Sequence, residues 1–201
     1  MKITLMIEEW RQSTKGGRST LMRQMAIELS RLENVKIGIL IPSASPVDKV
    51  NAKKYNIKVF ETENNTGYEP VDCLQFPPQG FSTDFIIGHG IKPGCYGQAL
   101  MKKLSCKWVH VVLRNAEEMA IFKKTLGAIF EGQKQHKNEE ELFKKAEMVI
   151  TVGSKLVGPK LNETFNSAPH QCKKDHIFNL IPGIFDEFFW RAEPIPKFKD
   201  L

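Results

Sequence analysis

The sequence lacks several features that would each define a class of protein. No stretch of its 201 residues approaches the roughly 18 consecutive uncharged apolar residues that a membrane-spanning helix needs. Its four cysteines include no CxxC pair, so their spacing predicts neither a structural zinc site nor a disulfide framework. Glu8 and Glu9 follow the short apolar run at the N-terminus, which is not the pattern of a secretory signal. We expect a cytoplasmic protein with reduced thiols.

The residue patterns of common catalytic and cofactor sites are also absent. No cluster of His, Cys, Asp and Glu has the spacing of metal ligands, and no Ser, His and Asp form a defensible triad. The chain contains neither the GxxxxGK[ST] loop of a Walker site nor the GxGxxG fingerprint of dinucleotide binding. No internal repeat or low-complexity tract is visible. We therefore expect no cofactor and no metal.

The chain carries a net charge of +6, which favours anionic partners. Its lysines are interspersed with glutamates, as in residues 139–145, and no stripe of basic and aromatic residues is present. A small phosphorylated ligand or an acidic surface explains the excess charge as well as nucleic acid does. A simply solvated basic surface is a further explanation. We expect no nucleic-acid partner.

Apolar runs alternate with helical patterns along almost the whole chain, which indicates an α/β protein. The runs predict seven strands, at residues 3–7, 35–41, 57–60, 84–90, 108–113, 149–152 and 177–181. Periodic apolar residues predict helices over residues 21–32, 45–55, 94–104, 116–130, 139–147 and 156–165. We expect the polar residues 132–135 to form a linker between the fourth and the fifth of these helices.

The alternation predicts a Rossmann-like, three-layer α/β/α domain with a mainly parallel sheet of about seven strands. We place this domain at residues 1–186. Residues 187–201 are aromatic and then rich in proline and lysine, and we expect a linker or tail there.

The segment between the first strand and the first helix is the clearest candidate site. Gly16 and Gly17 permit unusual backbone dihedrals and leave room for a ligand to approach the main chain. The first amides of the following helix have no internal partner, and the helix dipole favours an anion. This arrangement predicts a phosphate site that includes Ser19, with Arg18 or Lys15 adding charge-assisted hydrogen bonds. The alternative is a turn that needs glycine for steric reasons only.

Three further loops follow strands, and in parallel sheets ligands bind where the carboxyl ends of the strands meet. They carry six candidate residues: His89, Gly90, Arg114, Asn115, Ser154 and Lys155. His89 either orients a sugar or an acceptor hydroxyl, or is a loop histidine bonded to backbone. Arg114 suits an anionic acceptor group, with a salt bridge to Glu117 or Glu118 as the alternative. Ser154 could simply cap the next helix.

Four motifs occur in an order that resembles the N-terminal domain of retaining GT-B glycosyltransferases of the GT4 type. They are the Gly-Gly helix start, IIGHG at residues 86–90, AEMVITVGS at 146–154 and IPGIFDEFF at 181–189. In that family the Gly-Gly loop lies near the diphosphate of the sugar-nucleotide donor, and a later strand ends in histidine. Here Glu147 replaces the usual aspartate, and the last motif lacks an asparagine. The resemblance covers nearly the whole chain.

The resemblance implies the acceptor-side half of an enzyme that moves a sugar from a nucleotide-sugar donor to an acceptor, without a metal. The amides of Gly16 and Gly17 would then stabilise the diphosphate as the sugar leaves. Most of the donor pocket belongs to a second domain that would follow residue 201, so we expect this chain alone to be inactive. The alternative is a non-catalytic ligand-binding or interaction module that retains the fold.

One departure from the family favours the alternative. The family often has a histidine at the end of the fifth strand, where this sequence places Leu113 or Arg114. His110 lies earlier in the same strand, and by alternation its side chain points to one face of the sheet. We expect a core histidine there rather than a catalytic one.

Overall fold

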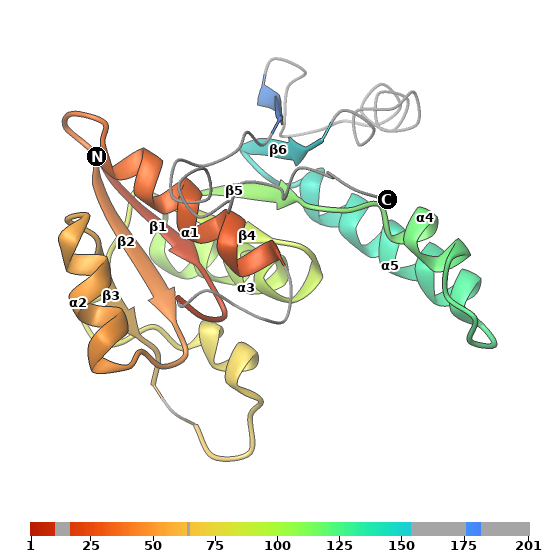
Figure 1. Ribbon diagram of the computed structural model, residues 1–201, viewed down its shortest axis with the longest axis horizontal. Coiled ribbons are helices and arrows are strands. Elements are labelled where there is room, and N and C mark those ends of the chain that lie inside the picture. Colours follow the sequence, from red (N-terminus) through yellow and green to blue (C-terminus); the bar gives the residue numbers. More distant parts are fainter. Residues whose placement is uncertain (11–16, 64, 154–175, 182–201) are drawn as a thin grey trace, which may run out of the picture.

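Seven parallel strands form one sheet in the computed structural model, which describes residues 1–10, 17–63, 65–153 and 176–181 (Figure 1). The strands are β1 (Lys2–Met6), β2 (Lys36–Ile41), β3 (Lys58–Glu61), β4 (Phe85–His89), β5 (Lys107–Val112), β6 (Met148–Val152) and β7 (Ile177–Leu180). Their spatial order is β3-β2-β1-β4-β5-β6-β7, and every neighbouring pair is parallel. The predicted fold is confirmed.

Helices cover both faces of this sheet, and α1 and α3 lie on opposite sides of it (Figure 1). The helical elements are α1 (Gly17–Ser30), α2 (Pro46–Lys54), the 3-10 helix η1 (Pro70–Gln75), α3 (Ile91–Leu104), α4 (Ala116–Ile121) and α5 (Ala128–Phe143). In the part of the chain that the structure describes, none of these helices has the length and apolar character needed to cross a bilayer.

The strands are apolar almost throughout because both faces of the sheet are covered. In β1, Ile3 and Leu5 belong to the core that packs against Met22 of α1. Met6 points to the other face and joins a second core around Trp108 of β5, beneath α3 and α5. Successive side chains of a strand alternate between faces, so one short run of residues serves two cores.

The start of α2 shows how local sequence sets an element boundary. The side chain of Ser45 accepts a hydrogen bond from the backbone amide of Asp48, at 3.1 Å. The Asp48 carboxylate accepts one from the backbone amide of Ser45, at 3.0 Å. Together they form a capping box, and Pro46 occupies the first turn, where its missing amide hydrogen costs nothing. The predicted helix start is confirmed.

Glycine residues bring α3 close to β5. A Cβ atom on Gly94 would lie 2.7 Å from Cε1 of His110, and one on Gly97 would lie 2.8 Å from Nε1 of Trp108. The two aromatic side chains also contact each other edge to face, with ring centroids 5.4 Å apart. The large rings on the strand therefore fill the space that the small residues of the helix leave open.

The expected linker at residues 132–135 is wrong. The second helix of this region, α5, runs through these residues, and the break between α4 and α5 falls at residues 122–127. Gly132 is buried inside α5, where a Cβ atom would lie 2.4 Å from Cβ of Ala120 and 2.9 Å from the backbone oxygen of Ala116. This glycine serves close packing of α4 on α5 and does not end a helix.

Gly132→Ala is expected to lower the free energy of unfolding by about 1–3 kcal/mol, because the added methyl group overlaps a backbone oxygen that cannot move without α4. Alanine has a higher helix propensity than glycine by about 1 kcal/mol, so the variant would be more stable than wild type if α4 were free to shift.

Denaturant-induced unfolding measures the difference in free energy of unfolding between wild type and the variant. Gln133→Ala, at the exposed neighbouring position, is the control and should be nearly neutral. A Gly132→Ala protein at least as stable as wild type would contradict this packing.

Candidate functional site

The order of the strands reverses at β1. This strand pairs with β2 on one side and with β4 on the other, and the register with β4 aligns Leu5 with Ile87. The chain runs outward from β1 through β2 to β3, and in the opposite direction from β4 to β7. Connections that leave in opposite directions open a crevice at the carboxyl ends of the two central strands, and such crevices bind ligands in open α/β sheets.

A cleft of about 470 Å³ lies at this carboxyl edge. Its lining includes Glu8 after β1, Arg18 in α1, His89 and Gly90 at the end of β4, Leu113 and Arg114 after β5, and α5 residues between 131 and 139. Candidate residues from three of the four segments singled out from the sequence thus line one cleft: Arg18, His89 with Gly90, and Arg114. Gly17 and Ser19 flank Arg18 in the first turn of α1, and Asn115 follows Arg114. Gly16, Ser154 and Lys155 lie outside the described residues.

His89 is buried at the base of this cleft, with only 2% of its surface exposed. It shares a sheet face with Ile87, which packs in the core beneath α1. Burial, the charge of Arg18 and the nearby His110 lower the pKa of His89 from 6.5 to about 4. The imidazole is therefore neutral at pH 7 and can both donate and accept a hydrogen bond.

Two helices begin at the cleft without a negative charge in their first turns, namely α1 and α3. Gly90 is the N-cap residue of α3 and has φ +57° and ψ −161°, a conformation that favours glycine. Among the described residues, no side chain caps α3. The first amides of a helix and its dipole attract anions, so both helix starts favour an anion in the cleft. In α4, by contrast, Asn115 Oδ1 accepts a hydrogen bond from the Glu117 amide at 3.0 Å.

Basic side chains around the cleft slightly outnumber acidic ones. Four bases (Arg18, Lys92, Arg114 and Lys134) and three acids (Glu8, Glu131 and Glu139) line it. Lys92 is paired with Asp72, at 3.0 Å. Arg18 and Arg114 form ion pairs with no acidic side chain that the structure describes.

His110 and Glu139 form a buried pair on the other side of β5. Nε2 of His110 lies 3.5 Å from Oε1 of Glu139, and both residues are nearly inaccessible to solvent. Neither ring nitrogen of His110 makes a hydrogen bond within the described ranges. His110 lies on the same face of the sheet as Trp108 and does not line the cleft. Its side chain is therefore part of the core, as expected. Its hydrogen-bonding groups are nevertheless unsatisfied.

Sequence reasoning missed the contribution of α5 to the cleft. Lys134 and Glu139 both line it, although residues 132–135 read as a polar linker. The only sequence signal for Glu139 was its place in a run of three glutamates, which is ordinarily a solvated helix surface. These two residues were missed because residues 132–135 are helical, and the continuous helix brings both side chains to the carboxyl edge of the sheet.

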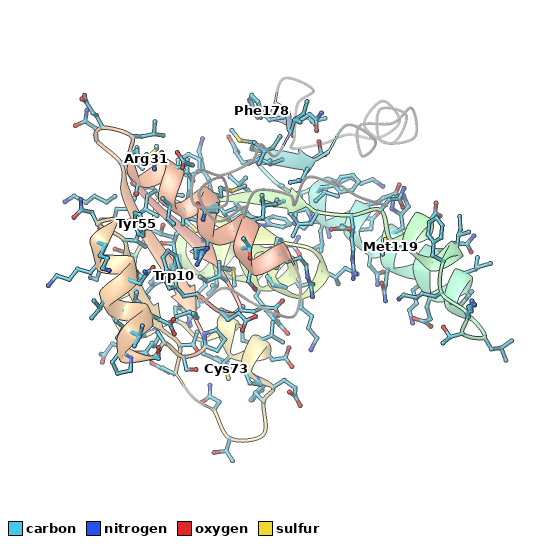
Figure 2. The ribbon with its side chains drawn as sticks, viewed as in Figure 1. Trp10, Arg31, Tyr55, Cys73, Met119 and Phe178 are labelled. Carbon is cyan, nitrogen blue, oxygen red and sulfur yellow. The ribbon has the colours of Figure 1, made fainter. Side chains whose placement is uncertain are left out.

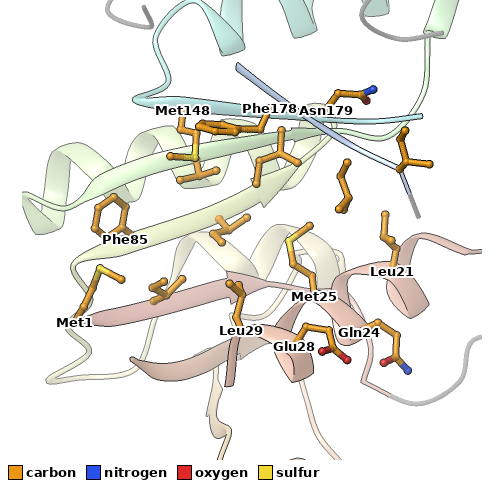
Figure 3. Close-up of a pocket in the computed structure, with 16 residues that line it drawn as sticks. Met1, Leu21, Gln24, Met25, Glu28, Leu29, Phe85, Met148, Phe178 and Asn179 are labelled. Carbon is orange, nitrogen blue, oxygen red and sulfur yellow. The ribbon is translucent and has the colours of Figure 1, made fainter. Parts of the chain in front are cut away.

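A larger cavity, of about 620 Å³, lies between α1 and strands β4 to β7 (Figure 3). Apolar side chains line most of it, including Leu21, Met25 and Leu29 of α1 and Met148 of β6. The polar side chains among its lining residues are few, and none is basic. A phosphate would lose its hydration there without compensation, so the smaller cleft is the better candidate for an anion. No group of three or more His, Cys, Asp or Glu side chains within the described ranges could hold a metal ion.

Comparisons with known proteins bear on this geometry. A family model described as "GT4-conflict: Family 4 Glycosyltransferase in conflict systems" matches residues 5–199. No curated protein matches the chain. Among solved structures, UGT2 from Phytolacca americana is 7% identical with a TM-score of 0.56, over 94% of this chain and 54% of that one. Sucrose-phosphate synthase from Thermosynechococcus elongatus is 10% identical with a TM-score of 0.54, over 90% and 47%.

A third similar structure is UGT89C1 from Arabidopsis thaliana, solved in complex with UDP-L-rhamnose. It is 11% identical with a TM-score of 0.51, over 96% of this chain and 56% of that one. At such identities the likeness shows a shared fold alone. The chain spans about half the length of these solved relatives.

The burial of His89 predicts a specific pH dependence of stability. Its pKa is about 4 in the folded chain and about 6.5 when unfolded, so below pH 6.5 the unfolded state binds the proton more readily. Between pH 6.5 and 4, the free energy of unfolding of wild type should therefore fall by up to about 3 kcal/mol more than that of a His89→Gln variant. Chemical denaturation at several pH values measures the free energy of unfolding of both proteins. The carboxylates titrate in both, so their effect cancels in the difference. Parallel stability curves for the two proteins would contradict the burial of a neutral imidazole.

Proposed function

Since this chain belongs to the GT4-conflict family, the family 4 glycosyltransferases in conflict systems, we propose that its cleft binds the diphosphate of a nucleotide-sugar donor. The observation that carries the proposal is the convergence of Arg18, His89 and two helix starts on one carboxyl-edge cleft. The similar Arabidopsis protein was solved in complex with UDP-L-rhamnose, which supports a nucleotide-sugar as the ligand class.

In this proposal the first turn of α1 faces the diphosphate. The amides of Gly17 to Ser19 and the guanidinium of Arg18 stabilise the charge that grows on the phosphate oxygens as the sugar departs. Charge-assisted hydrogen bonds from an arginine fork suit this role. Because these groups supply positive charge at the diphosphate, the proposed reaction needs no metal and no cofactor.

The other cleft residues serve the sugar and the acceptor. His89, neutral at pH 7, hydrogen-bonds a hydroxyl group without adding charge. Arg114, on the loop after β5, binds an anionic group of the acceptor. We further propose that a second domain of the same protein closes the cleft from the opposite side, so that this chain alone binds a donor without transferring sugar. The proposed location is the cytoplasm, with no nucleic acid as partner.

A second candidate function is a binding module without catalysis. It is favoured by the end of β5, where Leu113 and Arg114 stand in place of a histidine. His110 cannot substitute, because it is buried on the opposite face from His89. In this case the cleft holds a phosphorylated ligand, and binding itself is the function.

Calorimetric titration with UDP tests the diphosphate site, which both candidates share. Arg18→Ala should weaken binding about tenfold or more, since a hydrogen bond to a charged group contributes about 1.5–3 kcal/mol. Arg31→Ala is the matched control, because Arg31 is exposed beyond the far end of α1 and pairs with Glu28 at 2.8 Å. Its Kd should equal that of wild type. Equal Kd values for Arg18→Ala and Arg31→Ala would contradict a diphosphate site in this cleft.

A further inference from the structure

Residues 119–130, the end of α4, the connecting loop and the start of α5, form a projecting surface that we call the hairpin tip. Figure 1 shows α4 and the first part of α5 extending beyond the sheet, and Figure 2 labels Met119 on this arm. Six large apolar side chains of the tip are exposed: Met119, Ile121, Phe122, Leu126, Ile129 and Phe130. The exposed fraction is 81% for Phe122 and 107% for Leu126. Apolar surface of this extent on a soluble domain marks an interaction site.

In the pair of helices α4 and α5, small residues are buried and large apolar residues are exposed, which is the opposite of ordinary helix packing. Its buried residues include Ala116, Ala120, Ala128 and Gly132, which let α4 approach α5 closely. The large apolar residues point outward, although packing between helices usually buries such residues. The close contact of α4 with α5 is made at the small residues, so it does not require these large side chains.

The charges of the hairpin tip have one sign. Lys123 and Lys124 are exposed, and residues 119–130 contain no acidic residue. Farther along α5, Lys134 and Lys137 are exposed as well, together with one acidic residue, Glu131. Exposed phenylalanine and leucine beside lysine are typical of segments that lie in the interface of a membrane, where the rings insert and the lysines remain at the headgroups. The tip is thus complementary to an apolar layer covered by negative charge.

A protein partner fits these features less well. The centres of protein interfaces are depleted in lysine and enriched in arginine, and the hairpin tip contains two lysines and no arginine. We propose that the hairpin tip docks on a membrane surface rich in anionic phospholipid.

Docking would place the cleft next to the lipid headgroups. Five α5 residues between Glu131 and Glu139 line the cleft, and Glu131 directly follows Ile129 and Phe130 of the tip. A ligand or acceptor held at the membrane surface would then lie within reach of the cleft. The docking itself does not depend on the proposed function, and it stands even if the cleft binds no donor.

Vesicle flotation tests the proposal with the full chain. Wild type should float with vesicles of phosphatidylcholine and phosphatidylserine and bind pure phosphatidylcholine vesicles at least about tenfold more weakly, because anionic headgroups attract lysine. Phe122→Ser with Leu126→Ser should reduce binding to the anionic vesicles at least about tenfold, because the inserted side chains are lost. Lys123→Gln with Lys124→Gln should remove the preference for phosphatidylserine.

Val47→Ser with Val50→Ser is the matched control, because these side chains are 76% and 61% exposed on α2. This double variant should bind vesicles as wild type does. Absent vesicle binding, or the same loss in the control, would overturn the proposal. A dimer in sedimentation velocity that Phe122→Ser with Leu126→Ser dissociates, without vesicle binding, would overturn it in favour of contact between copies of this chain.

Discussion

The reversal of strand order between β1 and β4 is the constraint on which the rest of the structure depends. Because the connections from these neighbouring strands leave in opposite directions and on opposite faces, neither α1 nor α3 covers their shared carboxyl edge. Both helices begin there instead. The cleft, its two helix starts and the meeting of Arg18 with His89 all follow from that one feature of the topology.

Burial and charge are divided between different groups in the cleft. His89 lies too deep to be protonated at pH 7, so its neutral ring can offer hydrogen bonds to a ligand but no charge. Arg18 and the helix starts supply the positive potential, and Arg18 in turn helps to keep the imidazole neutral. The glycines of α3 hold that helix against β5, which fixes the position of its first turn at Gly90. The proposed diphosphate site depends on this division of burial and charge.

The sequence was sufficient for the strands and for the parallel sheet, because strands covered on both faces are continuous apolar runs. Ser45 and Pro46 likewise marked the start of α2 through local capping. Packing between helices left no such local signal. Gly132 was misread because its role is close contact with Ala120, and the same error hid Lys134 from the predicted site. The exposed large residues of the hairpin tip have the pattern of a buried helix face, which only the structure distinguishes.

The most direct test of the account is amide chemical-shift mapping of the isotopically labelled chain during titration with UDP. A diphosphate held by the helix starts predicts the largest shifts at Gly17, Arg18 and Ser19, with a second group at Gly90 and Ile91. Residues of the apolar cavity, such as Leu29 and Met148, should not respond. Unchanged amide chemical shifts in the first turn of α1 at saturating UDP would contradict an anion site at the carboxyl edge of the sheet. Shift changes centred on the apolar cavity would contradict it as well.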